Sequence, residues 1–312
     1  MSFVPVYPDF APITLDMSGE LDPFCKNLEE GVCEFVFANL FLVKNKYEYT
    51  ITRLSDASYA LSGVEHTGGA SGFQGSFFSI LASPASLPPF ELIEELLARH
   101  DFWKSVTQAQ YQAFGGLLEA KGFRAELNRS NFDYLYLRSD LAELRGKKFH
   151  KKKNLVNAFN AAYPDARVEA INDANKSEAL AVLNTWERLH VENEVTDYES
   201  CKSALAYMRE LGLDGILARI GGKPAAFSLG EPMAAGGMYC VHFEKAIDAY
   251  KGIYQYVNQQ EALALPESVT YINREQDVGD EGLRQAKMTY RPVKFVEKYA
   301  VFPPASRSLQ EL

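Results

Sequence analysis

Short apolar stretches separated by polar turns run through the first half of the chain, and their spacing follows two different periods. Runs that alternate every second residue predict β-strands, whereas apolar residues that recur every three or four positions predict helices with one buried face. On this basis we expect helices within 22–42, 90–99 and 111–121, and strands over 47–54, 59–64, 76–81, 103–108 and within 123–137. This irregular order favours a mixed α/β unit over a regular βαβ repeat.

The second half of the chain has a more regular order. Gly221 and Gly222 stand between two alternating runs, which is typical of a β-hairpin with a two-residue turn. We expect strands over 167–171, 214–220, 223–229 and 238–244, and helices over 175–194, 199–211 and 252–264. The pattern therefore predicts sequential strands of one sheet, followed by a helix that leads to a further strand.

The next stretch, 271–278, alternates like a strand but carries polar side chains on both faces. Asn273, Glu275 and Asp277 would share one face, and Arg274 would lie on the other. A strand without an apolar face must direct its polar groups to a partner, a ligand or water. We therefore expect a functional cluster here, with an ordinary surface strand, turn and helix as the alternative.

Two elements are expected to follow this stretch. Gly279 ends the predicted strand, and a short helix over 281–290 carries Lys287 and Tyr290 before Pro292 stops it. The residues 295–302 then read as one final strand.

A dense basic segment lies near the middle of the chain. So many like charges repel one another unless water, acids or phosphate screen them. On a helix that starts near Gly146, these residues would form neighbouring faces. The candidate phosphate- or RNA-binding residues are Lys147, Lys148, His150, Lys151, Lys152 and Asn154. A solvated helix that joins two domains is the alternative.

Composition adds limits to this picture. The chain has 312 residues, of which 47% are hydrophobic, so it can form one large or two ordinary domains with their own cores. The net charge of -9 argues against charge-driven binding to duplex DNA, although a local basic patch can still hold phosphates.

The cysteine pattern and the termini bear on location. Four cysteines without a CxxC pair favour a reduced, cytoplasmic protein, and His66 and His100 have no second ligand at metal spacing, so no metal is expected. The N-terminus lacks the pattern of a signal peptide, and the apolar stretch 35–43 is too short to cross a bilayer.

Several long phrases carry a resemblance to a known family. They are YINREQDVGDEGLRQAKMTYRP, LRGKKFHKKKNLVNAF, CEFVFANLFLVKNKYEYTITRL and GKPAAFSLGEP. Together they resemble the family named after the C-terminal catalytic domain of phosphatidylglycerol lysyltransferases, and most closely its short, free-standing members. The resemblance implies an α/β fold of mixed sheets with two tandem domains of the GCN5-related N-acetyltransferase (GNAT) type, shared with aminoacyl-tRNA-dependent transferases.

The cofactor loop that this fold implies is degenerate. In acetyltransferases an R/Q-x-x-G-x-G/A loop wraps pyrophosphate with backbone N–H groups at the start of the central helix. The chain reads AYKGIY over 249–254, where only Gly252 matches a glycine of that pattern. This loss disfavours an acyl-CoA as the acyl donor and fits an aminoacyl-tRNA, whose ester lies at an RNA end, with an acyl-CoA as the alternative donor.

Acyl transfer to an amine or hydroxyl needs a base and groups that hold the developing oxyanion. Glu275 and Asp277 are the candidate bases or ammonium holders, with Asn273 as a third catalytic candidate. The candidate substrate-binding residues are Arg274, Lys287, Tyr290, His242 and Glu244. His242 and Glu244 stand two apart on one strand face, so a simple cross-strand polar pair is the alternative for them. Cys240 is expected to pack without acting as a nucleophile.

We therefore expect two GNAT-like domains, over 1–160 and 161–312, that together form an acyltransferase or aminoacyltransferase. The expected partners are a small-molecule or lipid acceptor and the acceptor end of tRNA, with peripheral membrane contact as a further option and no duplex DNA. The alternative is a non-catalytic module that binds a nucleotide, a lipid head group or a protein.

Overall fold

The computed structural model describes residues 3–66, 74–190 and 196–304. The chain divides into two compact units. Unit 1 comprises Met1–Asp133, Gln276–Glu281 and Phe295–Leu312, and unit 2 comprises Tyr134–Glu275 and Gly282–Lys294. The sequence predicts a single cut after residue 160, whereas the contacts divide the chain earlier and return its last segment to unit 1. The difference arises because the last strand pairs with distant strands, which local sequence does not reveal.

Unit 1 is built on a seven-stranded sheet with the order β1-β2-β3-β4-β5-β14-β6. Strand β14 lies between β5 and β6 and is antiparallel to both, while β4 and β5 are parallel. The strands are β1 (Ala11–Pro12), β2 (Thr50–Ser55), β3 (Ser58–His66), β4 (Gln74–Ala82), β5 (Phe102–Val106), β6 (Arg124–Leu127) and β14 (Tyr299–Phe302). The helices are α1 (Ser18–Lys26), α2 (Phe37–Tyr47), α3 (Phe90–Leu97) and α4 (Gln108–Ala120). The sequence also predicts a glycine-rich turn at Gly68, Gly69, Gly72 and Gly75; the first three glycines lie outside the described residues, and Gly75 lies in β4.

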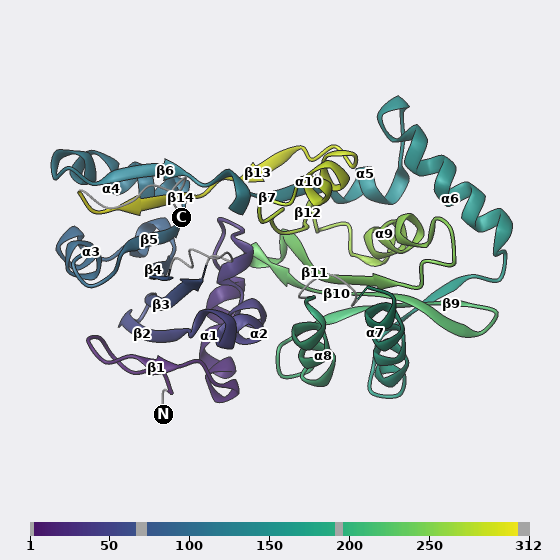
Figure 1. Cartoon of the computed structure of the whole chain (residues 1–312), viewed down its shortest axis with the longest axis horizontal. Coiled ribbons are helices and arrows are strands. Elements are labelled where there is room, and N and C mark those ends of the chain that lie inside the picture. Colours follow the sequence, from purple (N-terminus) through teal and green to yellow (C-terminus); the bar gives the residue numbers. More distant parts are fainter. Residues whose placement is uncertain (1–2, 67–73, 191–195, 305–312) are drawn as a thin grey trace. The chain divides into compact units, whose positions relative to one another are not determined.

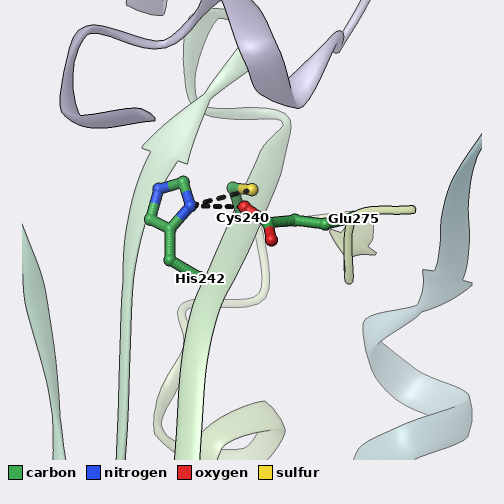
Figure 2. Close-up of side chains that lie close together, drawn as sticks. All are labelled: Cys240, His242 and Glu275. Carbon is green, nitrogen blue, oxygen red and sulfur yellow. Dashed lines mark hydrogen bonds and ion pairs between the residues drawn. The ribbon is translucent and has the colours of Figure 1, made fainter. Parts of the chain in front are cut away.

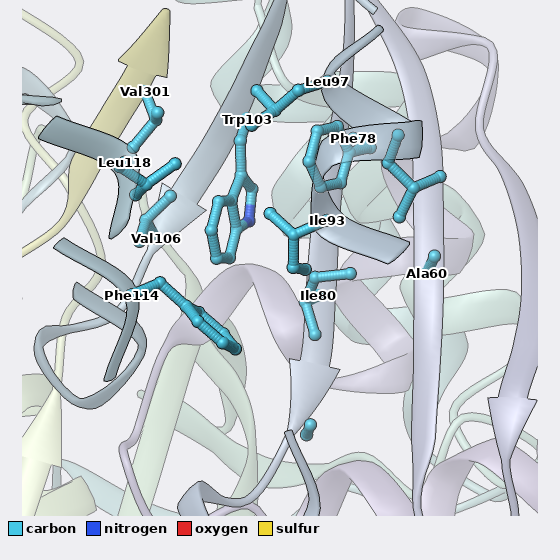
Figure 3. Packing of buried hydrophobic residues seen from close by; sticks show 12 residues of the cluster. Ala60, Phe78, Ile80, Ile93, Leu97, Trp103, Val106, Phe114, Leu118 and Val301 are labelled. Carbon is cyan, nitrogen blue, oxygen red and sulfur yellow. The ribbon is translucent and has the colours of Figure 1, made fainter. Parts of the chain in front are cut away.

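A hydrophobic core fills the space between this sheet and helices α3 and α4. Trp103 of β5 stacks on Phe78 of β4 with ring centroids 5.6 Å apart. Figure 3 shows Ile93 from α3 and Phe114 from α4 packed around the same tryptophan. The amphipathic spacing of these two helices therefore buries one face of each, as expected.

Unit 2 supplies nearly all of a second seven-stranded sheet, with the order β13-β7-β12-β11-β10-β9-β8. Helices α7 and α8 lie on one face of this sheet and α9 lies on the other (Figure 1). The strands are β7 (Asp133–Leu137), β8 (Arg167–Ala170), β9 (Asp214–Ile220), β10 (Lys223–Met233), β11 (Met238–Ala246), β12 (Tyr271–Asn273) and β13 (Lys294–Val296). The helices are α5 (Arg138–Glu143), α6 (His150–Ala162), α7 (Lys176–His190), α8 (Tyr198–Ala206), α9 (Ile253–Ala264) and α10 (Glu281–Met288).

Most of the elements expected in the second half are confirmed. Gly221 and Gly222 join β9 and β10 in the predicted hairpin, with Ile220 paired to Lys223. The helix expected over 252–264 is α9, and the mixed α/β class with two mixed sheets is confirmed. Because β12 is parallel to β11 and antiparallel to β7, the sheet is mixed at its centre.

Two strand predictions near the C-terminus are wrong. The strand expected over 271–278 ends at Asn273, because Glu275 and Val278 have φ angles of 55° and 47°, which an extended strand cannot contain. The single strand expected over 295–302 is two strands, β13 and β14, that belong to different sheets. Lys298, between them, is fully buried.

No helix in the described part of the chain is long and apolar enough to span a membrane.

Glu261 is a buried acid on α9 whose environment disfavours its charge. Only 4% of its surface is exposed, and burial raises its pKa to about 7 although Ser228 and Tyr239 act in the opposite direction. In the unfolded chain the same carboxyl titrates near 4.5. The folded state therefore binds this proton more tightly than the unfolded state does.

This difference predicts a loss of stability as the pH rises. Below pH 4.5 the neutral Glu261 makes its full contribution to the free energy of unfolding. This contribution declines as the pH rises to about 7, and the total loss is about 3 kcal/mol. Urea unfolding of the wild type and of Glu261→Gln across this range should show a decline that is steeper in the wild type by about this amount. Parallel pH profiles for the two proteins would contradict the prediction.

Candidate active site

Three neighbouring strands of unit 2 bring polar residues into one row across the sheet. Glu231 of β10 pairs with Cys240 of β11, and Cys240 pairs on its other side with Asn273 of β12. Directly paired residues project from the same face of a sheet. The pairing of β11 with β12 ends at this row, so the residues that follow in the two strands diverge.

A β-bulge places His242 next to this row. Leu229 lies opposite Phe243 and Gly230 lies opposite Val241, so His242 is an extra residue in β11. Gly230 permits the close approach of the strands here, because a Cβ atom on it would lie 2.1 Å from the carbonyl oxygen of Cys240. The β-bulge at His242 therefore depends on glycine at position 230, because a side chain there would clash with β11.

His242 is bound by a carboxylate at each ring nitrogen. Its Nδ1 lies 2.7 Å from Oε1 of Glu275, and its Nε2 lies 3.1 Å from Oε1 of Glu231. The sulfur of Cys240 lies 3.8 Å from the same Nδ1. Figure 2 shows the side chains of Cys240, His242 and Glu275 turned toward one another.

These neighbours decide the charge of the imidazole. Burial alone would lower the pKa of His242, but the Cys240 sulfur and the carboxylates of Glu231 and Glu275 outweigh it and raise that pKa well above its usual value. His242 is therefore an imidazolium at neutral pH, held between two acids.

Glu275 connects this cluster with solvent. Its side chain is 25% exposed, whereas that of Glu231 is fully buried. The backbone N–H of Glu275 donates a 2.7 Å hydrogen bond to Oδ1 of Asn273, which is itself buried. Asn273 thus fixes the chain where it leaves β12, and Glu275 is the one of the two acids that solvent reaches.

A second group of polar side chains comes from nearby positions of the chain, since Arg274 follows β12 directly and Glu244 stands two residues after His242 in β11. The guanidinium of Arg274 contacts Glu244 at 3.1 Å, and it lies 5.5 Å from the ring of Tyr290. Burial by itself would lower the pKa of Arg274, but Glu244 outweighs it and raises that pKa. Burial also raises the pKa of Tyr290 to about 12, so the phenol is neutral.

Lys152 is the basic-segment residue that reaches this second group. Its ammonium lies 3.9 Å from the centre of the Tyr290 ring. Burial and then the nearby Arg274 lower its pKa, although Glu244 acts the other way. Lys152 and Arg274 thus both lie near the ring of Tyr290. Because the two positive charges repel each other, a bound anion would stabilise this arrangement.

The rest of the basic segment is more open to solvent. Lys147 lies in a 3-10 turn (Lys147–Phe149) that precedes α6, and Lys148 forms a 2.6 Å ion pair with Asp140. The exposed residues of the segment include His150, Lys151 and Asn154. Their role in binding RNA or phosphate stays a prediction.

Two other predicted residues have mainly structural contacts. The ammonium of Lys287 donates to the backbone carbonyl of Arg274, which fixes the chain after β12. Gly252, at the N-terminus of α9, has a φ of 91°, and a Cβ atom on it would lie 2.9 Å from the carbonyl oxygen of Leu155 in α6. A helix therefore lies close to the residue expected to wrap phosphate, and its phosphate role stays a prediction.

Asp277 does not share a strand face with Asn273 and Glu275, so that expectation is wrong. Asp277 belongs to unit 1, where it is fully buried. It contacts Arg129 at 3.1 Å and accepts a hydrogen bond from the N–H of Gly279. These contacts hold the turn that precedes α10, and its catalytic role stays a prediction.

Sequence reasoning missed a buried charge cluster in unit 1. Lys298 donates to Asp133 at 2.6 Å and also contacts Glu34. Ser105, with a φ of 53°, donates to the same glutamate at 3.1 Å. The sulfur of Cys33 lies 3.3 Å from Asp133. One ammonium contacts both acids and offsets part of their charge, and these contacts connect separate elements of unit 1.

Sequence reasoning also missed Glu231 and the contribution of Cys240 to the site. The only local signal was the Cys-x-His spacing within one strand. Glu231 lies nine residues before Cys240, so its contact with His242 follows only from the strand register.

Two compact units, two seven-stranded mixed sheets and the helices that pack on them define a mixed α/β protein. The chain belongs to the family described as phosphatidylglycerol lysyltransferase, C-terminal, whose profile matches residues 25–302. The resemblance stated from the sequence is thereby confirmed.

Three proteins illustrate what the chain is similar to. A conserved protein of unknown function from Bacteroides thetaiotaomicron is 28% identical, with a TM-score of 0.82 over 94% of this chain and 99% of its own. L-PGS from Bacillus licheniformis shares the fold at 16% identity, with a TM-score of 0.64 over 100% of this chain and 96% of its own. An uncharacterized protein of Mycoplasmoides gallisepticum is 23% identical over 193 residues, which are 56% of this chain and 57% of that protein. The match thus spans little more than half the length of that relative.

Proposed function

We propose that the chain is a transferase that moves an acyl or aminoacyl group to an amine or hydroxyl, with Glu275 as its general base. The observation that carries the proposal is the position of Glu275. It is held by buried partners on one side, His242 at 2.7 Å and Asn273 at its backbone, and it is partly exposed on the other. Family membership and the shared fold of L-PGS support this reaction class.

The reaction follows from the chemistry of these groups. The acceptor's N–H or O–H donates to the Glu275 carboxylate, which takes the proton while the nucleophile attacks the carbonyl of the donor ester. His242 is a positioning residue, since its imidazolium holds the carboxylate and is itself held by Glu231. The ester bond breaks, and the leaving alkoxide takes up the proton that Glu275 accepted, which restores the carboxylate.

Lys152 and Arg274 supply a place for an anionic part of the donor. Both cations contact the ring of Tyr290, and burial and then the nearby Arg274 lower the pKa of Lys152. A phosphate of an RNA end would offset the charge of these cations. The degenerate loop at Gly252 and its contact with α6 favour an aminoacyl-tRNA over an acyl-CoA as donor.

The test is a binding and transfer assay with candidate donors. Aminoacylated tRNA at about a hundred times its dissociation constant should stabilise the protein by about 2.7 kcal/mol, and labelled aminoacyl groups should appear on vesicles that contain phosphatidylglycerol or on soluble amines. Lys152→Met should weaken tRNA binding by about tenfold. Lys153→Met, which removes the same charge at an exposed neighbouring position, is the control and should change binding by less than threefold.

Other outcomes would redirect the proposal. Stabilisation by an acyl-CoA with label transfer from the thioester would contradict the tRNA donor but keep the reaction class. Binding of tRNA or nucleotide without transfer to any acceptor would favour the alternative, a non-catalytic binding module.

A further inference from the structure

Cys240, His242 and Glu275 offer one sulfur, one nitrogen and one oxygen to a common point. The three atoms all lie within 4.8 Å of one another. They come from neighbouring strands, with Cys240 and His242 on β11 and Glu275 just after β12 (Figure 2). A thiolate, an imidazole and a carboxylate together are a ligand set that Zn²⁺ binds.

A second observation points the same way. The ring nitrogen of His242 that does not face the cluster contacts Glu231, whose side chain is fully buried. Histidines that bind metals regularly donate their other N–H to a carboxylate, which fixes the tautomer and orients the lone pair toward the metal. Glu231 holds a proton on Nε2 and thereby leaves Nδ1 as the nitrogen that can bind a cation.

We propose that Cys240, His242 and Glu275 form a binding site for a zinc-class divalent cation, with Glu231 as the carboxylate that orients His242. Binding releases the thiol proton and the proton on Nδ1 to solvent, and the metal takes the place of the latter between His242 and Glu275. Three protein ligands leave a fourth position for water or a substrate atom.

The geometry requires one adjustment. Ligand atoms around a tetrahedral zinc lie about 3.4 Å apart, given metal distances of about 2.0 to 2.3 Å. The Cys240 to His242 separation of 3.8 Å is close to this value, but the His242 to Glu275 separation of 2.7 Å is shorter. Glu275 must therefore move outward, and its partly exposed side chain at the end of β12 has room to do so.

This inference goes beyond the proposed transfer and does not depend on it, because metal binding is measured without any acyl donor. It also has a consequence for that reaction. A metal ion would take the carboxylate of Glu275 that the transfer needs as a base, so metal-loaded protein should transfer more slowly than metal-free protein.

The first experiment is a titration of chelator-treated full-length protein with Co²⁺, which reports thiolate ligation by a charge-transfer absorption band. One equivalent should bind with a dissociation constant below about 10 µM, and Zn²⁺ should displace it. Cys240→Ser should abolish the band, and Glu231→Gln should weaken binding by about 10- to 100-fold. Cys25→Ser is the control, since Cys25 is a buried cysteine of unit 1, and it should leave the band unchanged.

A second measurement needs no variant and keeps the proposal testable if Cys240→Ser fails to fold. X-ray absorption of the wild-type zinc complex should show one sulfur at about 2.3 Å and nitrogen or oxygen ligands at about 2.0 to 2.1 Å. Absence of one-to-one binding, or a zinc shell without sulfur, would overturn the proposal. Transfer activity without metal binding would leave the proposed function standing and reject only this site.

Discussion

Replacing Glu275 by glutamine is expected to slow acyl transfer by about 10²- to 10⁴-fold while the unfolding midpoint and donor binding stay close to those of the wild type. Glutamine has the same shape as glutamate, and its side-chain oxygen can still accept a hydrogen bond from His242. It cannot take a proton from the attacking amine or hydroxyl. The expected loss therefore falls on the rate of the chemical step.

The measurement is single-turnover transfer of a labelled aminoacyl group at saturating donor, together with thermal unfolding and donor titration. Glu267→Gln is the matched control, because Glu267 is an exposed acid of unit 2 and should keep the wild-type rate. A Glu275→Gln protein that keeps more than about a third of the rate would rule out the general-base role. A loss of donor binding instead would point to Glu275 as a holder of the substrate ammonium.

Replacing Lys298 by methionine is expected to destabilise unit 1 by about 3 to 5 kcal/mol near neutral pH. The ammonium is fully buried and contacts both Asp133, which is fully buried, and Glu34, whose side chain is 16% exposed, so its removal takes away the cation that both acids contact. Methionine fills most of the volume of the lysine stem, so the loss reports charge rather than a cavity.

The measurement can be confined to unit 1. The chain has two tryptophans, Trp103 in the core of unit 1 and Trp186 in unit 2, so a Trp186→Phe background leaves a single reporter of unit 1. Urea unfolding followed by Trp103 fluorescence should show the loss. Lys121→Met is the control, since the Lys121 pair with Glu94 is half exposed and should contribute little.

The pH dependence of the same variant provides a further check. Without Lys298 the buried acids favour their protonated forms in the folded state, so their folded pKa values lie above the unfolded ones. The penalty is then present at high pH and shrinks as the pH falls, and Lys298→Met should approach the wild type near pH 5. A loss that stays constant with pH would mean that packing, not charge, accounts for it.

Local patterns predicted the elements whose causes are local. Two adjacent glycines specify the turn between β9 and β10, and apolar spacing specifies α9 and the buried face of α3. The strand expected over 271–278 failed because alternation continues past Asn273 while the backbone turns at Glu275. Only the contacts of that turn, which involve Asn273 and Arg274, distinguish the two outcomes.

The candidate site was predicted in part for a similar reason. The sequence showed the run of polar residues at 273–275, and it showed that His242 and Glu244 could share one face of a strand. It did not show their partners, because the structure pairs His242 with Glu275 and Glu244 with Arg274. Glu231 and Cys240 meet His242 through strand register and a bulge, and neither is encoded by spacing along one strand.

The position of β14 has a consequence for how the protein is made. Strands β5 and β6 leave the ribosome with the first half of the chain, but the strand that joins them is Tyr299–Phe302. Until those residues emerge, the nascent sheet of unit 1 has two open edges, while nearly all of unit 2 has already been synthesised. The N-terminal unit is thus the last to be completed, and translation that stops before residue 299 would release chains with exposed strand edges, which quality-control chaperones and proteases recognise.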